Sequence, residues 1–154
     1  MIRLDKIGAD SHIVSVKLAK DMKQGNVVTV GNKVEGEREI YNAAAPTTAA
    51  TDKIVVLTTP FHPYSPLDNE KDFVLKAGVP QRAHYLTSGD VITVTEDLIE
   101  GSPVKNQFVS AQDGNEKLKF SASSPSAATI FVVDDIESSV SCFQGKKGIV
   151  LRVL

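Results

Sequence analysis

The chain has 154 residues, the length of a single domain that can bury a core without disulfides or metals. Its 17 basic and 19 acidic side chains leave a net charge of −2, with both signs mixed along the chain. This excludes the basic footprint of a nucleic-acid-binding protein. The single cysteine, Cys142, excludes an intrachain disulfide and a thiolate metal cluster, and we expect it to be a small buried hydrophobe.

The hydrophobic content of 42% includes few aromatic residues and no tryptophan, which predicts a core of Val, Ile, Leu and Ala. No apolar run approaches the roughly 20 residues that a membrane span requires. The N-terminal residues also lack the apolar stretch and cleavage site of a signal peptide. We therefore expect no membrane association and no export by that route.

The first third of the chain predicts short strands separated by turns. Residues 12–18 and 27–30 are rich in β-branched side chains, and residues 21–26 form a turn between them. Residues 31–37 are polar and turn-rich. Residues 38–41 then predict a short strand, which we expect at the edge of a sheet.

The next segment predicts a loop and then a buried strand. Residues 43–51 consist of small side chains interrupted by Pro46, which removes a backbone donor and favours extended geometry before it. We interpret this stretch as a loop despite its alanines. Residues 53–59 are short, β-branched and closed by a proline, which predicts a strand near the centre of a sheet.

A proline-punctuated segment, residues 61–68, follows this strand. We expect an extended surface connection anchored by Phe61 or Tyr64, and such connections often contact partners. Residues 68–76 predict a short helix, because apolar side chains are followed by a glycine and a proline that would end it.

The remainder of the chain predicts strands at close spacing. Residues 82–86 and 91–94 are expected to form a hairpin, joined by a turn at Ser88-Gly89-Asp90. A second hairpin is expected from turn signals at residues 112–115. The remaining strands are expected over residues 104–110, 117–120, 128–133 and 149–154. Strands at this spacing favour an all-β fold, a compact barrel or sandwich of short antiparallel strands with long loops and at most one short helix.

One short phrase occurs twice in the chain. Gly25-Asn26-Val27-Val28-Thr29-Val30 is echoed by Gly89-Asp90-Val91-Ile92-Thr93-Val94. Glycine supplies the positive φ of a tight turn, Asn or Asp bonds the local backbone, and the β-branched run fits a pleated surface. The echo is consistent either with equivalent hairpins of a duplicated barrel or with coincidence, since such runs are common in all-β proteins.

The sequence gives only weak signals for catalytic or metal-binding sites. His12, His62 and His84 stand without a nucleophile elbow or a paired metal-ligand spacing, so we interpret them as surface or strand histidines. The carboxylates at positions 134, 135 and 137 could bind calcium or perform acid-base work, but a strand end turning into solvent explains them more simply. We expect no catalytic residues, no cofactor and no metal.

Two segments carry a resemblance to a known family. Residues 77–95 (AGVPQRAHYLTSGDVITVT) and 99–104 (IEGSPV) resemble a pattern in small structural proteins of tailed bacteriophages, and residues 148–154 resemble their closing strand. His84 departs from the pattern, which often has an aromatic residue there. The family includes capsid decoration proteins, also called head-stabilising or cement proteins.

The resemblance implies a non-enzymatic virion protein, made in the host cytoplasm, that binds the outside of an assembled capsid and stabilises contacts between capsomers. Its implied partners are the major capsid protein and further copies of itself, with a trimer favoured. A tail, tail-tube or connector component is the alternative, and a hydrolase is a less favoured one.

We expect one β-rich domain over residues 1–154, with residues 1–10 as an extended N-terminal arm. A terminal arm or an edge strand can pair with a neighbouring chain through main-chain hydrogen bonds. The residues expected to contact the capsid or another partner are Ile2, Arg3, Leu4, Phe61, His62 and Tyr64.

Overall fold

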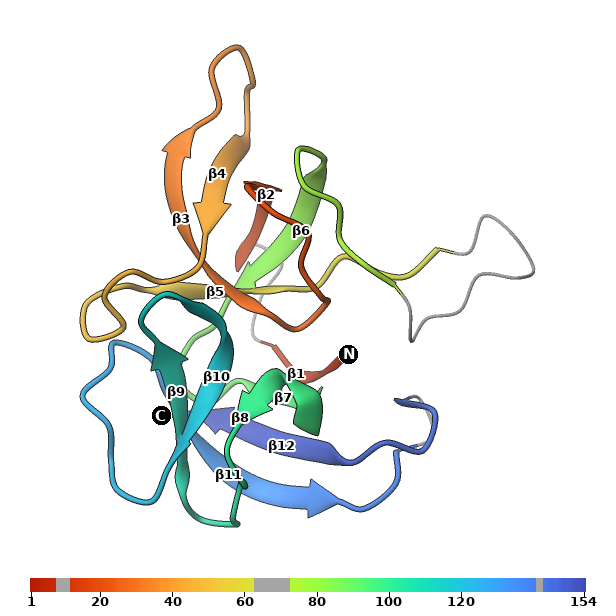
Figure 1. The fold of residues 1–154 in the computed structure, drawn as a ribbon, viewed down its shortest axis with the longest axis vertical. Coiled ribbons are helices and arrows are strands. Elements are labelled where there is room, and N and C mark those ends of the chain that lie inside the picture. The colour runs from red at the N-terminus through yellow and green to blue at the C-terminus, as the bar shows by residue number, and fades with distance from the viewer. Residues whose placement is uncertain (8–11, 63–72, 141–142) are drawn as a thin grey trace.

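The computed structural model describes residues 1–7, 12–62, 73–140 and 143–154 (Figure 1). Its strands are β1 (Ile2–Lys6), β2 (Ile13–Leu18), β3 (Val27–Lys33), β4 (Ile40–Ala44), β5 (Ile54–Leu57), β6 (Pro80–Tyr85), β7 (Val91–Thr95), β8 (Ile99–Glu100), β9 (Phe108–Gln112), β10 (Asn115–Ser121), β11 (Ile130–Glu137) and β12 (Gly148–Val153). A single turn of 3₁₀ helix, η3 (Glu96–Leu98), lies between β7 and β8. The expected all-β architecture is confirmed.

Strands β2 to β6 form a closed barrel in the order β2-β4-β3-β5-β6. All pairs are antiparallel except β2 and β4, which run parallel, and β6 closes the barrel by pairing with β2. Alternate residues point inward, so the interior is filled by a small core of aliphatic side chains. This interior core contains Val16, Leu18, Met22, Val28, Ala43, Val55, Leu57, Leu75 and Ala83.

The other strands form an open sheet in the order β1-β7-β12-β11-β9-β10-β8, which occupies the lower half of Figure 1. One face of this sheet packs against the outside of the barrel. The core between them contains Val27, Ile54 and Val56 from the barrel, together with Ile92, Phe131 and other side chains of the sheet. Strands β3 and β5 therefore serve two cores, one on each face.

The first copy of the repeated phrase forms a tight turn that leads into β3. Gly25 has a φ of +91°, and the Asn26 Oδ1 accepts a hydrogen bond of 2.7 Å from the Lys23 backbone N–H. The Gly25 N–H donates to the Leu57 carbonyl at 2.8 Å, and the Leu57 N–H donates to the Asn26 carbonyl at 3.0 Å. The turn thus begins the pairing of β3 with β5.

The second copy has the same geometry. Gly89 has a φ of +91°, and the Asp90 Oδ2 accepts a hydrogen bond of 2.8 Å from the Thr87 N–H. The Gly89 N–H donates to the Val153 carbonyl at 3.0 Å, and the Val153 N–H donates to the Asp90 carbonyl at 2.9 Å. Both copies therefore form the same local structure. In each, the turn begins a strand and bonds the last residue of the strand that pairs with it.

The equivalence does not extend to whole units. The first phrase leads into the closed barrel, and the second leads into the open sheet, which has a different strand order. A duplicated barrel is therefore not observed in the described residues.

The expected hairpin of residues 82–86 and 91–94 is wrong. Strand β6 pairs with β2 and β5 in the barrel, whereas β7 pairs with β1 and β12 in the sheet. The turn at Gly89 is held by Val153 of β12, so the chain passes from one sheet to the other. A tight turn between two strands does not require those strands to pair.

Three further expectations are corrected. Residues 2–6, expected within an extended arm, form β1 and pair with β7, because Ile2 gains burial against the core. The strand predicted at a sheet edge is β4, which lies between β2 and β3 and continues into the alanines expected to form a loop.

Of the predicted helix, residues 68–72 lie outside the described residues, and Leu75 instead bridges to Met22 through backbone bonds of 3.0 and 2.8 Å.

Candidate functional site

The first group of expected contact residues lies on β1, an end strand of the open sheet. Ile2 is half-buried and packs against the core shared by barrel and sheet. Leu4, on the same face of the strand, keeps 39% of its surface exposed. Only Leu4 of this pair therefore offers an apolar side chain to a partner.

Arg3 lies on the opposite face and is committed to bonds within the chain. Its guanidinium donates to both carboxylate oxygens of Glu137 at 2.9 and 3.2 Å, to the Thr93 hydroxyl at 3.1 Å, and to Asp5. Hydrogen bonds to Glu137 and Asp5 raise the pKa of Arg3 above its usual value. Arg3 therefore ties β1 to β11 across the sheet, and a structural role accounts for it.

The second group lies at the base of the proline-rich connection. Phe61 is half-buried and meets Phe73 edge-on, with ring centroids 5.3 Å apart and an interplanar angle of 65°. His62 is exposed, and Tyr64 lies outside the described residues. The Phe61–Phe73 contact brings together the two ends of the connection, where the chain leaves the barrel and returns to it.

Both ends of this connection are anchored to the barrel. On the outgoing side, the Thr59 hydroxyl accepts a bond of 2.7 Å from the Arg82 N–H, and the Gln24 side chain donates to the Thr59 carbonyl at 3.1 Å. On the returning side, the buried Leu75 inserts into the barrel core, and the Asp21 carboxylate accepts a bond of 2.8 Å from the Ala77 N–H. The barrel thus provides a firm base for the segment between residues 59 and 75.

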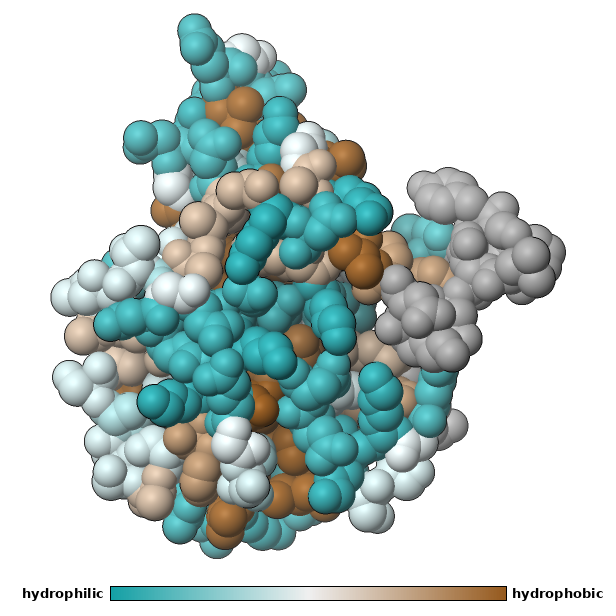
Figure 2. Space-filling model, in the orientation of Figure 1, coloured by the Kyte–Doolittle hydropathy of each residue, from teal (hydrophilic) through white to brown (hydrophobic). Residues whose placement is uncertain are grey.

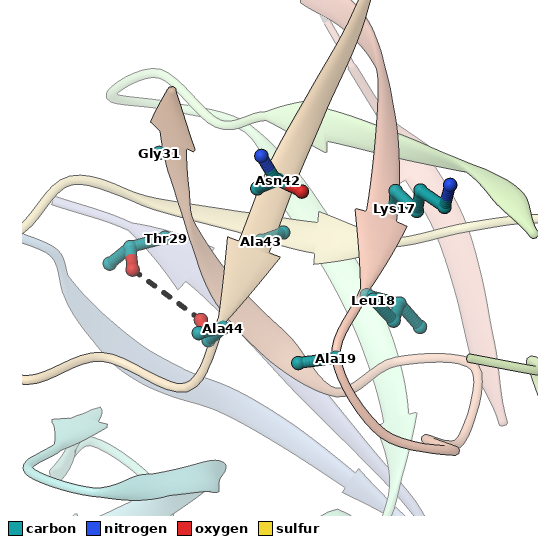
Figure 3. A pocket seen from close by; sticks show the side chains of 8 residues that line it. All are labelled: Lys17, Leu18, Ala19, Thr29, Gly31, Asn42, Ala43 and Ala44. Atoms are coloured by element: carbon teal, nitrogen blue, oxygen red, sulfur yellow. Dashed lines mark hydrogen bonds between the residues drawn. The ribbon is translucent and has the colours of Figure 1, made fainter. Parts of the chain in front are cut away.

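A shallow groove of about 320 Å³ lies on the outside of the barrel, across β2, β4 and β3 (Figure 3). Small side chains, including Ala19, Ala44 and Gly31, leave the space that forms it. Lys17 and Asn42 add an ammonium and an amide, and the Lys17 ammonium has no hydrogen bond or ion pair with any described residue. The groove was not apparent from the sequence, because Ala43 and Ala44, which line it, were expected to lie in a loop.

The dense carboxylates at the end of β11 do not act together. Asp134 accepts bonds of 2.9 and 3.1 Å from Arg152, Asp135 pairs with Lys105 at 3.2 Å, and Glu137 pairs with Arg3. Each carboxylate is therefore neutralised by a different cation. The part of the chain that the structure describes contains no group of three or more His, Cys, Asp or Glu side chains able to hold a metal.

The histidines occupy different environments. His84 is buried in β6, with its Nδ1 2.6 Å from the Thr58 hydroxyl oxygen, whereas His62 is exposed. His12 stands immediately before β2, and its Nδ1 is buried. The hydroxyl beside His84 belongs to a threonine in the barrel wall, where it also contacts the Arg82 carbonyl at 3.5 Å.

Comparison of the chain with family models, with curated proteins and with solved structures finds no match. Among the described residues, none of the helical segments has the length and apolar character required to cross a bilayer.

Proposed function

We propose that this protein is a non-enzymatic virion structural protein that binds the outer surface of an assembled phage capsid and stabilises contacts between capsomers. The sequence resemblance over residues 77–104 and 148–154 supports the capsid assignment. These residues form β6 of the barrel and β7, β8 and β12 of the open sheet. The resembling segments therefore supply the scaffold, and segments that leave it supply the contacts.

The observation that carries the proposal is the firm base of the proline-rich connection. The Phe61–Phe73 contact and the bonds at Thr59 and Ala77 hold both ends of this connection against the barrel. A partner that binds a segment with fixed ends loses less conformational entropy than one that must order a free chain. On a repeating lattice, many weak contacts of this kind add up to stable attachment.

The proposal is tested by cosedimentation with empty, expanded shells of a tailed phage that encodes this chain. We expect the wild-type protein to pellet with the shells and to raise the temperature at which the shells dissociate. His62→Ala and Leu4→Ala remove exposed side chains and should each weaken shell binding by about three- to tenfold, the range expected for side chains of moderate importance in an interface.

Val104→Ala is the matched control, because Val104 is 48% exposed but lies in the connection between β8 and β9. It should leave shell binding unchanged. Failure of the wild-type protein to pellet with the shells, or shells that gain no heat resistance, would overturn the proposal. Rings or tubes formed by the protein alone, with a label found on tails, would assign it to the tail instead.

A further inference from the structure

The hairpin formed by β3 and β4 extends beyond the barrel. Its end, residues 33–40, protrudes at the top of Figure 1 and is hydrophilic at the top of Figure 2. Strand β5 pairs with β3 only as far as Thr29, so the hairpin end is a two-stranded ribbon. Such a ribbon without a third strand adds little to the stability of its own domain.

The hairpin end is nevertheless well defined and carries unpaired charge. Its turn is closed by bonds from the Val34 N–H to the Ile40 carbonyl at 2.9 Å and from the Glu37 N–H to the Val34 carbonyl at 3.2 Å. Glu35, Glu37 and Glu39 are all exposed, and none has an ion pair with a described residue. The exposed cations Lys33 and Arg38 lie in the same segment, so three carboxylates against two cations leave the hairpin end with a net charge of −1, and its turn, residues 34–37, presents two carboxylates.

The outer barrel face has the opposite character. We use this name for the outward-facing positions of β6, β2, β4 and β3 that the open sheet does not cover. They are Pro80, Arg82, Ser15, Lys17, Ile40, Asn42, Ala44, Thr29 and Gly31. The face contains two cations, Lys17 and Arg82, and no carboxylate, and neither cationic side chain has an ion pair with any described residue.

The groove of Figure 3 lies on this same face. In the strand register, Lys17 stands opposite Pro80 and Asn42, and Arg82 stands opposite Ser15 one step further along β2. Lys17 thus lines the groove opposite small side chains of β3 and β4, and Arg82 lies on the next strand, β6, beyond the edge of the groove. A narrow projection with two carboxylates in its turn, those of Glu35 and Glu37, is complementary in charge to this surface.

From this complementarity we propose that the hairpin end of one copy docks on the outer barrel face of a second copy. The carboxylates of Glu35 and Glu37 then approach Lys17 and Arg82. The contact joins two different surfaces, so it is a head-to-tail contact. It goes beyond the proposed function, since it concerns two copies of this chain and needs no shell.

The contact is small, and it depends on charge. Interfaces below about 1,200 Å² are typically weak and transient, so we expect association in the high-micromolar range in dilute solution. Exposed charge pairs are screened by salt, because the Debye length falls from about 10 Å at 0.1 M to about 3 Å at 1 M. Association should therefore weaken at least fivefold between 0.05 and 0.5 M sodium chloride.

Sedimentation velocity on charge-reversed variants of the full chain tests the contact. The face variant carries Lys17→Glu with Arg82→Glu, and the hairpin variant carries Glu35→Lys with Glu37→Lys. Each alone should weaken self-association about tenfold. An equimolar mixture of the two should restore association, because the unchanged hairpin end of the face variant meets the unchanged face of the hairpin variant, and the two reversed surfaces are also complementary. A third variant, Lys53→Glu with Lys119→Glu, makes the same charge change at exposed lysines off the outer barrel face and should behave as wild type.

Each alternative outcome overturns the proposal. These are a wild-type protein that remains monomeric at millimolar concentration, association that salt or the variants do not change, and variants whose mixture does not restore association. Thermal melts confirm that the variants are folded, since all the substituted side chains lie at the surface. If the hairpin variant loses shell binding but keeps self-association, the hairpin end contacts the shell, which overturns this inference and leaves the proposed function intact.

Discussion

The barrel and the open sheet are built from similar strands, but they differ in closure. In the barrel every strand has a neighbour on both sides, so partners can reach it only through side chains and loops. The open sheet ends at β1 and β8. An end strand presents backbone groups as well as side chains, which is why Leu4 on β1 remains a candidate for contact.

The barrel and the open sheet also differ in how their cores are enclosed. The barrel encloses its own core, whereas the sheet depends on the barrel to cover one face. Polar links reinforce this dependence: Lys20 pairs with Glu116 at 2.8 Å, and the Asn26 side chain donates to the Glu116 carbonyl at 3.2 Å. The barrel therefore has a core of its own, whereas the core of the open sheet is completed by the barrel.

The largest expected effect comes from truncating one side chain in each of the two cores. Phe131 and Leu57 are fully buried, in the shared core and in the barrel interior respectively. Phe131→Ala should cost about 3–5 kcal/mol and Leu57→Ala about 2–5 kcal/mol. Because β3 and β5 serve both cores, denaturant unfolding followed by circular dichroism should remain one transition in both variants. Two separate transitions in Phe131→Ala would show that the barrel folds by itself.

A smaller effect distinguishes the two equivalent turns. Gly25 and Gly89 share the same positive φ, so alanine at either position incurs a backbone penalty of about 1–2 kcal/mol. A Cβ on Gly25 would also lie 2.5 Å from Cδ1 of the buried Leu98, whereas one on Gly89 meets nothing within 4 Å. Gly25→Ala should therefore be the more destabilising by about 1–3 kcal/mol, the typical range of overpacking costs. Equal melting temperatures for the two variants would contradict this packing difference.

The smallest expected effect concerns the stability of the folded protein in acid. It depends on Asp97 of η3, whose carboxylate pairs with Lys23 in the turn before β3. Burial opposes ionisation of Asp97, but hydrogen bonds from Thr95 and Lys23 outweigh it and lower its pKa from 3.8 to about 2. The folded state therefore binds this proton less readily than the unfolded state. The resulting stability is present above about pH 4 and is lost as the pH falls towards 2.

Because the Asp97 side chain is 35% exposed, we expect only about 1 kcal/mol from this effect. Urea unfolding at pH 6 and pH 2.5 measures it, and Asp97→Asn provides the reference. The loss of stability between the two pH values should be about 1 kcal/mol smaller in Asp97→Asn than in wild type. An identical loss in the two proteins would exclude a role for this carboxylate.

Parts of the candidate surfaces could be predicted from sequence and parts could not. The exposed position of His62 followed from the prolines around it, since prolines keep a segment out of strand pairing. The ion pair of Arg3 with Glu137 could not be predicted, because the two residues lie 134 positions apart in the sequence. The outer barrel face was equally hidden, because its cations on β2 and β6 become neighbours only through strand pairing.

Local sequence is sufficient to predict the positive-φ turns at Gly25 and Gly89, the β-branched strands that follow them, and hence the all-β class. These features depend on residues within a few positions of one another, where steric and hydrogen-bonding preferences act directly. Which strands pair with which depends on the complete fold. Strand pairing joins residues far apart in sequence, and its free energy comes from burial in the complete core, so β6 and β7 separate into two sheets although a tight turn connects them.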